Sequence, residues 1–226
     1  MDDMDTVLEL KNISKIYETK NNMQTVLKNV NLKIAKGDML AIMGRSGSGK
    51  STLLMIMGTL LKPSSGNIKV TGKDVLMLSP DEISELRREK TGFVFQDFRL
   101  FENLNVGENI ILPMVLNRNY SKEMKDRMLH IARRLEIESV LEKSVSEISG
   151  GEKQKVALGR ALINDPDIIL ADEPTGNLDT GSRNMILDLF MTINKEMGKT
   201  IIIVTHDHYA AKQCKKIVEL RDGNIL

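Results

Sequence analysis

The sequence has little of several residue types that would place it in a specialised class. Its 226 residues include no tryptophan and one cysteine, Cys214, and aromatic residues make up only 4% of the chain. A single cysteine cannot form a disulfide within the chain, so we expect a reducing compartment such as the cytosol. With 5 prolines and 16 glycines, the composition excludes collagen-like and disordered classes and is typical of a globular protein.

Two further absences concern partners. The 32 Lys and Arg residues against 31 Asp and Glu leave a formal net charge of +1, so no global positive field attracts nucleic acid or anionic lipid. The longest apolar runs, such as residues 201–204, are far shorter than the ~18 residues of a membrane-spanning helix. The acidic start, residues 1–5, is the opposite of a basic secretory signal. We therefore expect any membrane role to come through a partner protein, and we expect no nucleic-acid partner.

What the sequence does contain is a set of short apolar runs, each leading directly into a polar segment. Residues 39–43, 168–171 and 201–204 are typical of buried strands in a parallel sheet. Between the last two runs, apolar residues recur on one face of a predicted helix that ends at Gly198; they are Ile186, Leu189, Phe190, Ile193 and Met197. Strand, helix and strand in this order predict an α/β fold.

The middle of the chain has a helical pattern instead. Ser79 and Glu82 have capping-box spacing around Pro80 and predict a short helix. Ser121 is the expected cap of a longer helix with an apolar stripe that includes Ile131. No repeat or flexible linker interrupts the sequence.

We therefore predict a single domain over residues 1–226. Its core comprises residues 1–95 and 161–226, and a helical subdomain of about residues 96–160 is inserted between them. Alternating apolar and polar residues near both ends of the chain predict antiparallel edge strands.

The strongest motif is a phosphate-binding loop. Residues 44–51 (GRSGSGKS) match the pattern of Gly, four residues, Gly, Lys and Ser, between a predicted strand and an apolar helix start. Glycines let consecutive N–H groups point inward, and the helix N-terminus adds positive potential, so the loop can hold a polyphosphate. Lys50 is expected to reach the β- and γ-phosphates, Ser51 to bind Mg²⁺, and Thr52 to contact phosphate.

Two adjacent carboxylates follow the next buried strand. Asp172 and Glu173 precede Pro174, which stops regular strand pairing. Alone, the pair is best read as a solvated strand end. Beside a phosphate loop, Mg²⁺ would offset the charge of Asp172, and Glu173 could orient and deprotonate an attacking water.

A third segment offers further N–H groups to an anion. The sequence ISGGE, from Ile148 to Glu152, has the local chemistry of a capping box at Ser149, with Gly150 and Gly151 leaving N–H groups open. Alone, it predicts only a helix start. Because it lies between the phosphate loop and the acidic pair, it resembles the signature sequence of the ATP-binding cassette (ABC) ATPases. The family usually has Leu and Gln at its two ends.

The resemblance covers essentially the whole chain, with the motifs in the family's order, and it implies a P-loop NTPase (RecA-like) core. It implies that Gln96 senses Mg²⁺ and the water, and that Asp179 lies in a loop crossing a dimer interface. By the same resemblance His206 contacts the γ-phosphate and Tyr17 stacks on adenine. Alone, each of these four signals is weak, and residues such as Gln96, His206 and Tyr17 in these settings are more often structural than functional.

The family's mechanism pairs two cassettes head to tail, so that the phosphate loop of one copy and the signature of the other enclose each ATP. The resemblance therefore implies ATP and Mg²⁺ as cofactors, an ATPase activity, and a second copy of the chain as a partner. The implied catalytic residues are Glu173, His206 and Gln96, and the metal ligands are Ser51, Gln96 and Asp172. The implied ATP-binding residues are Tyr17, Gly44, Ser46, Gly47, Ser48, Gly49, Lys50, Ser51, Thr52, Ser149, Gly150, Gly151 and Asp179.

Within the family, residues 171–179 (ADEPTGNLD), 43–47 and 223–226 resemble the macrolide-exporter and lipoprotein-releasing branch. That branch implies a permease with few membrane spans and a large extracytoplasmic domain. The cassette is expected at the cytoplasmic face of the cell membrane, powering extrusion of an antibiotic, peptide or lipoprotein.

Other functions stay open. A non-transport ABC ATPase would carry a long coiled coil or a second cassette, and neither is present in this sequence. A regulatory subunit that binds ATP without turnover is disfavoured by Glu173 and His206. An importer cassette differs chiefly in its membrane partner, and motifs do not fix the direction of transport.

Overall fold

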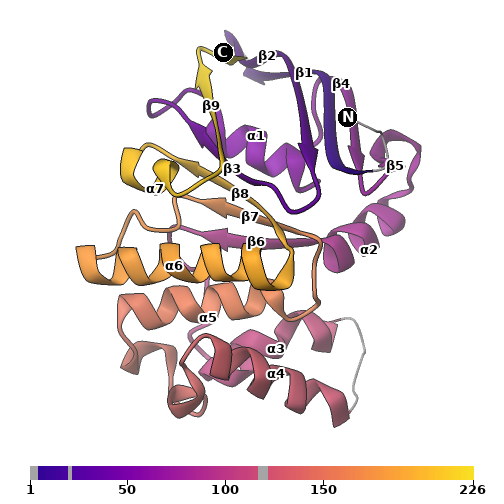
Figure 1. Cartoon of the computed structure of the whole chain (residues 1–226). Helices are drawn as coiled ribbons and strands as arrows, with labels where there is room; N and C mark the ends of the chain where they lie inside the picture. The colour runs from indigo at the N-terminus through magenta and orange to yellow at the C-terminus, as the bar shows by residue number, and fades with distance from the viewer. Residues whose placement is uncertain (1–4, 20–21, 117–121) are drawn as a thin grey trace.

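The computed structural model describes residues 5–19, 22–116 and 122–226. Their strands form two sheets (Figure 1). The 6-stranded sheet has the order β10-β9-β3-β8-β7-β6, with β3 (Met39–Met43), β6 (Thr91–Phe95), β7 (Ile168–Asp172), β8 (Thr200–Thr205), β9 (Lys216–Arg221) and β10 (Asn224–Ile225). The 4-stranded antiparallel sheet has the order β2-β1-β4-β5, with β1 (Thr6–Thr19), β2 (Asn22–Ala35), β4 (Ser65–Val70) and β5 (Lys73–Asp74).

The helices form layers around the larger sheet (Figure 1). Helix α1 lies between the two sheets, and α6 and α5 lie against the opposite face, with α3 and α4 beyond them. The helices are α1 (Lys50–Met57), α2 (Pro80–Lys90), α3 (Val106–Leu116), α4 (Lys122–Arg134), α5 (Gly150–Leu162), α6 (Thr180–Met197) and α7 (His208–Lys212). Short 3₁₀ turns are η2 (Val75–Met77), η3 (Glu138–Val140) and η4 (Val145–Glu147).

The apolar runs are continuous because both faces of the central strands are covered. In β3, Leu40 and Ile42 face the core that contains α1 and the second sheet, whereas Met39 and Ala41 face the core of helices α3 to α6. The parallel register sets Leu40 opposite Ile202 of β8, so neighbouring strands present matching faces. Because these neighbouring strands are parallel, the polar segments that follow them lie at the same edge of the sheet.

The predicted helical segment lies between β6 and β7. It holds α3, α4, η3, η4 and most of α5. The apolar stripe of α4 packs into the core shared with α3 and α5, as Ile131 and Leu135 illustrate. Helix α5 extends to Leu162, past the predicted subdomain boundary at residue 160. Ser121, the expected cap of α4, lies outside the described residues.

The structure confirms the predicted helix start at Ser79 and helix end at Gly198. The Ser79 hydroxyl accepts a hydrogen bond from the N–H of Glu82, and the Glu82 carboxylate accepts one from the N–H of Ser79. Gly198, with φ 64°, closes α6 in the left-handed conformation.

The end strands differ from the prediction in arrangement. Strands β1 and β2 are antiparallel but belong to a separate sheet with β4 and β5. Strand β9 is parallel to β3, because α7 carries the chain back across the sheet after β8, and such a crossover yields a parallel strand. Among the described strands of the larger sheet, β10 alone is antiparallel to its neighbour.

Candidate nucleotide site

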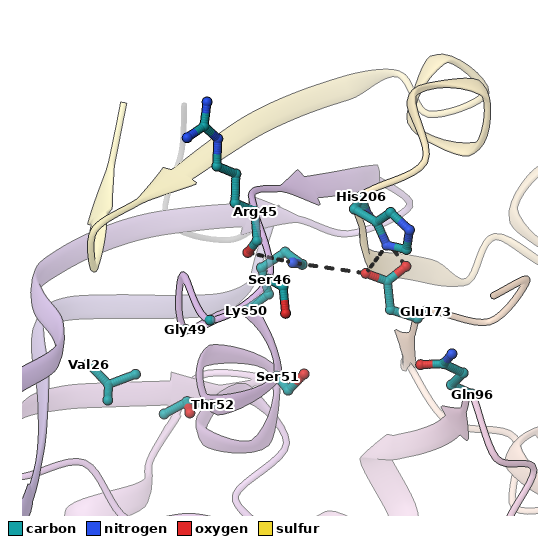
Figure 2. A pocket seen from close by; sticks show the side chains of 11 residues that line it. Val26, Arg45, Ser46, Gly49, Lys50, Ser51, Thr52, Gln96, Glu173 and His206 are labelled. Atoms are coloured by element: carbon teal, nitrogen blue, oxygen red, sulfur yellow. Dashed lines mark hydrogen bonds and ion pairs between the residues drawn. The ribbon is translucent and has the colours of Figure 1, made fainter.

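A cavity of about 630 Å³ lies at the carboxyl ends of the parallel strands (Figure 2). Strand β3 leads into the glycine loop and α1, while β6, β7 and β8 are followed directly by Gln96, Glu173 and His206. Most of the residues lining the cavity come from these strand ends, a usual place for ligands in α/β sheets. The lining consists of Val26, Arg45, Ser46, Gly47, Gly49, Lys50, Ser51, Thr52, Gln96, Glu173 and His206.

The glycine loop is shaped by close packing. Gly49 has φ 102°, and a Cβ there would lie 2.9 Å from the carbonyl oxygen of Val26, so only glycine fits without strain. Lys50 is a buried residue, 7% exposed. Its side chain folds back over the loop and donates to the carbonyls of Gly44 (2.8 Å) and Arg45 (3.1 Å). Its ammonium therefore already lies inside the loop that would surround a phosphate.

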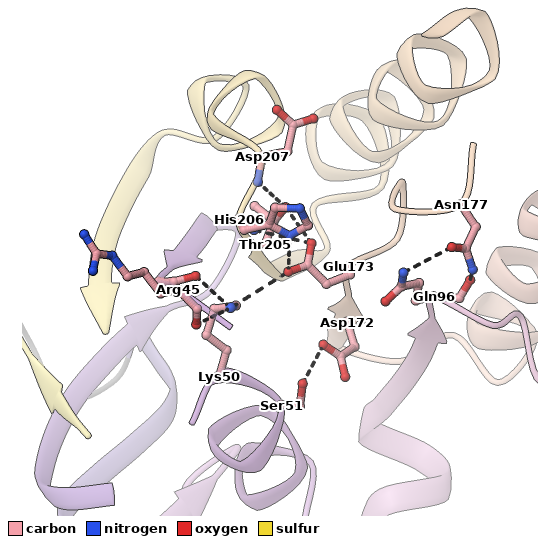
Figure 3. A network of polar contacts seen from close by, with 11 residues as sticks. Arg45, Lys50, Ser51, Gln96, Asp172, Glu173, Asn177, Thr205, His206 and Asp207 are labelled. Carbon is pink, nitrogen blue, oxygen red and sulfur yellow. Dashed lines mark hydrogen bonds and ion pairs between the residues drawn. The ribbon is translucent and has the colours of Figure 1, made fainter. Parts of the chain in front are cut away.

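The Glu173 carboxylate lines the cavity and is held there by several polar contacts (Figure 3). Its Oε2 accepts from the Thr205 hydroxyl (3.0 Å) and the His206 N–H (3.3 Å), and its Oε1 lies 2.9 Å from Nδ1 of His206. Lys50 Nζ is 3.9 Å from the same Oε1. The backbone of Glu173 has φ 46°, a strained conformation for a residue with a Cβ, which is typical of functional positions.

Asp172 faces the start of α1. The Ser51 hydroxyl donates to its Oδ1 at 3.0 Å. Burial raises the pKa of the Asp172 carboxyl and the hydrogen bond from Ser51 opposes this shift. The Ser51 hydroxyl and the partly buried Asp172 carboxylate place two hard oxygen atoms side by side, and such oxygens are the ligands that Mg²⁺ prefers.

Gln96 is fixed by the loop after β7. Its Nε2 donates to Oδ1 of Asn177 (3.2 Å), and Nδ2 of Asn177 donates to the carbonyl of Gln96 (3.1 Å). Gly176 leaves room for this pair, since a Cβ there would lie 2.8 Å from Nε2 of Gln96. The Gln96 side chain thus lies in the cavity wall and is tied to the segment leading to Asp179.

Other sequence-predicted residues lie outside the cavity lining. These are Gly44, Ser48, Asp172, Tyr17, Ser149, Gly150, Gly151 and Asp179. Gly44 and Asp172 still contact cavity residues, as described above. Tyr17 is 41% exposed on β1, with the ammonium of Lys15 5.2 Å from its ring centroid.

The signature segment and the Asp179 loop lie together. Ser149 and Glu152 form a capping box at the start of α5. A Cβ on Gly151 would lie 3.0 Å from Oγ of Ser182, and one on Gly150 would lie 3.6 Å from Leu178. The N-termini of α5 and α6 thus form one surface.

Sequence reasoning missed Arg160, which organises the loop after Gln96. Its guanidinium donates to the carbonyls of Phe98 and Arg99, both in the left-handed region with φ 59° and 48°. Burial lowers the pKa of Arg160. An arginine within an amphipathic helix gives no local signal of this role.

A glycine loop holding a buried lysine, followed by an acidic strand end and a strand-end histidine, defines a P-loop nucleoside triphosphatase. Comparisons with known proteins identify the class more closely. The family model described as "ABC transporter" matches residues 27–176. The chain therefore belongs to the ABC transporter family, and it is an ATP-binding, ATP-hydrolysing cassette.

Similar proteins cover nearly all of the chain. It is 40% identical to the bacitracin export ATP-binding protein BceA of Halalkalibacterium halodurans over 97% of this chain and 87% of that protein. It is 41% identical to the macrolide export ATP-binding/permease protein MacB of Syntrophobacter fumaroxidans, covering 97% of this chain and 31% of MacB. A dimeric post-hydrolysis structure of the cassette MJ0796 with ADP and Pi matches with a TM-score of 0.89 at 40% identity, covering 96% of each chain. In the part of the chain that the structure describes, no helix is long and apolar enough to cross a membrane.

Proposed function

We propose that this chain is the ATP-hydrolysing subunit of an exporter and that ATP closes two copies of it head to tail. The observation that carries the proposal is the grouping of Lys50, Glu173 and His206 around one cavity. Export is supported by the similarity to BceA and MacB, whose names describe bacitracin and macrolide export. We assign the chain to the macrolide-exporter and lipoprotein-releasing branch of the family. The alternative, an importer cassette, would differ chiefly in its membrane partner.

In the proposed site the glycine loop binds the phosphates. Lys50 would move its ammonium from the carbonyls of Gly44 and Arg45 to the β- and γ-phosphates. The N–H groups of Ser46 to Ser51 and the start of α1 would hold the remaining oxygens. Tyr17 would stack on adenine at the open side of β1.

The proposed metal ligands are Ser51, Asp172 and Gln96, together with phosphate oxygens. The 3.0 Å contact between Ser51 and Asp172 supports this set. Bound Mg²⁺ would neutralise charge on the phosphates. Asp172 would then be ionised, because a nearby cation lowers the pKa of a carboxyl group.

Glu173 is the proposed general base. It would accept a proton from a water lying in line with the γ-phosphate, while Thr205 and the His206 N–H hold the carboxylate in place. The His206 side chain is 70% exposed and could turn from Glu173 to the γ-phosphate. Glu173 and His206 would then separate only when nucleotide is bound.

The Ser149, Gly150 and Gly151 segment would complete the site of a second copy. These residues and Asp179 line no part of this chain's own cavity, yet the helix N-terminus after Ser149 offers N–H groups suited to an anion. The dimeric structure of the similar cassette MJ0796 supports this arrangement. Phosphate release would remove the shared charge and open the pair.

A groove beside the Gln96 loop is the proposed contact with a membrane permease. It has a volume of about 530 Å³ and lies between β6, α2, α3 and α5. Its apolar wall includes Phe93, Leu112 and Phe101, and Phe101 is 50% exposed. A cytoplasmic helix of a permease with few spans and a large extracytoplasmic domain would fit here. The cassette would then lie at the cytoplasmic face of the cell membrane, and residues 96–160 would act as one subdomain.

The test is nucleotide-dependent dimerisation of Glu173→Gln, because slowed hydrolysis should keep ATP between the copies. Gel filtration of this variant with ATP and Mg²⁺ should give a dimer, whereas ADP should give a monomer. The matched control is Lys50→Ala combined with Glu173→Gln, which should stay monomeric. A monomer of Glu173→Gln at saturating ATP would contradict the proposal.

A further inference from the structure

We infer that Arg183 is a positioning residue that connects the Asp179 loop to the general base Glu173. The inference rests on the function proposed above. Arg183 lies in the first turn of α6 and lines no part of the nucleotide cavity. Its contacts form the middle of a series of contacts that leads from Asp179 to Glu173 and consists of hydrogen bonds, an ion pair and a ring contact.

The first part of this series of contacts lies at the start of α6. Oδ1 of Asp179 accepts from the N–H groups of Gly181 (2.9 Å) and Ser182 (3.0 Å), and the Ser182 hydroxyl donates to Oδ2 at 2.6 Å. The N–H of Arg183 donates to the Asp179 carbonyl at 2.8 Å. Any shift of Asp179 against a second copy would therefore move the backbone that carries Arg183.

The second part is the contact between Arg183 and the segment after His206. Nη1 of Arg183 lies 3.6 Å from Oδ2 of Asp207, with both side chains 28% exposed. The guanidinium carbon lies 4.6 Å from the ring centroid of Tyr209, within the range of a cation–π contact. Because the ion pair is mostly shielded and the ring covers one face of the guanidinium, this side chain has a defined position.

The third part leads from Asp207 to the base. The N–H of Asp207 donates to Oγ1 of Thr205 at 3.0 Å, and the same hydroxyl donates to Oε2 of Glu173 at 3.0 Å (Figure 3). Thr205 is fully buried, and its one hydroxyl oxygen makes both contacts. Moving Asp207 would turn this hydroxyl and change the position of the Glu173 carboxylate.

These contacts give Arg183 a defined task in the proposed reaction. Docking of a second copy at Asp179 would be transmitted through Arg183 and Asp207 to Thr205 and Glu173. The base would therefore be aligned best when the dimer has closed. Loss of Arg183 should slow the chemical step and leave ATP affinity unchanged, because the side chain does not reach the cavity.

The test is a double-mutant cycle on steady-state ATP turnover with Arg183→Met, Asp207→Asn and the combined variant. Methionine keeps most of the length without the charge, and asparagine keeps the acceptor for the Tyr209 N–H, which lies 2.7 Å from Asp207. We expect each single variant to lower kcat about fivefold or more, with KM for ATP changed less than about twofold. The double variant should fall no further than the slower single variant, since contacting residues are non-additive.

Two readouts separate positioning from a general loss of structure. Arg183→Lys, which restores a cation facing Asp207, should recover most of the lost kcat. Arg183→Met combined with Glu173→Gln should still dimerise with ATP, because the dimer surface is intact. Unchanged kcat in Arg183→Met, or additive losses in the cycle, would overturn the inference. Failure of the proposed function would appear differently, as wild-type turnover that Glu173→Gln does not reduce.

Discussion

The replacement Glu173→Gln removes the basicity of this side chain and keeps its position. Glutamine has the same length, and its carbonyl can still accept from the Thr205 hydroxyl and the His206 N–H at the 3.0 and 3.3 Å positions of the carboxylate oxygen. The strained backbone, with φ 46°, is unaffected by a change at the end of the side chain. What is lost is the ability to accept a proton from water.

The size of the effect follows from that loss. General-base catalysis contributes about 10²–10⁴-fold, so kcat should fall by this factor, or about 2.7–5.5 kcal/mol in activation free energy. ATP binding should be unchanged or tighter, because Lys50, 3.9 Å from Glu173, no longer faces a negative charge there.

The assay is phosphate release at saturating ATP and Mg²⁺, together with calorimetric titration of ATP. The matched control is Glu82→Gln, the same chemical change in a capping box of α2, where glutamine also serves. It should hydrolyse ATP at the wild-type rate. Turnover of Glu173→Gln within tenfold of wild type would refute the general-base role.

Further predictions concern the metal ligand, the thiol and the base-stacking ring. Asp172→Asn should raise the melting temperature of the nucleotide-free protein near neutral pH, because partial burial disfavours the ionised carboxylate of Asp172 and raises its pKa. As the pH falls through that raised pKa the wild type takes up the stabilising proton, so the difference in scanning calorimetry should shrink; a constant difference would contradict this. Burial raises the pKa of Cys214 to about 11, so a disulfide reagent at pH 8 should label the native protein far more slowly than the unfolded one, and equal rates would refute this packing. Tyr17→Ala should weaken ATP by the ~1–3 kcal/mol of a base stack and leave tripolyphosphate binding unchanged, whereas equal losses would remove Tyr17 from the adenine site.

Local sequence signals predicted the parts of the fold that depend on neighbouring residues. The glycine loop, the capping box at Ser79 and the Gly198 helix end each follow from steric and hydrogen-bonding preferences over a few positions. The apolar strands were also found, because burial on both faces requires continuous runs such as that of β8.

Contacts between segments far apart in the sequence have no local sequence pattern that predicts them. Arg160 holds the carbonyls of Phe98 and Arg99, which lie 62 and 61 residues earlier, and nothing near it in sequence predicts this. The Gln96 and Asn177 pair joins positions 81 residues apart. The parallel direction of β9 depends on how α7 crosses the sheet, which alternation of apolar residues does not encode.

Complementation between two inactive variants tests the shared site most directly. Lys50→Ala should disable the phosphate loop, and Gly150→Asp should place a negative charge in the signature, where a Cβ would meet only Leu178 at an ordinary 3.6 Å. In a mixed dimer, one site would combine the intact loop of Gly150→Asp with the intact signature of Lys50→Ala. An equal mixture should therefore regain roughly a quarter of wild-type turnover, since about half the dimers are mixed and each has one intact site of two. A mixture as inactive as its separate components would contradict the account.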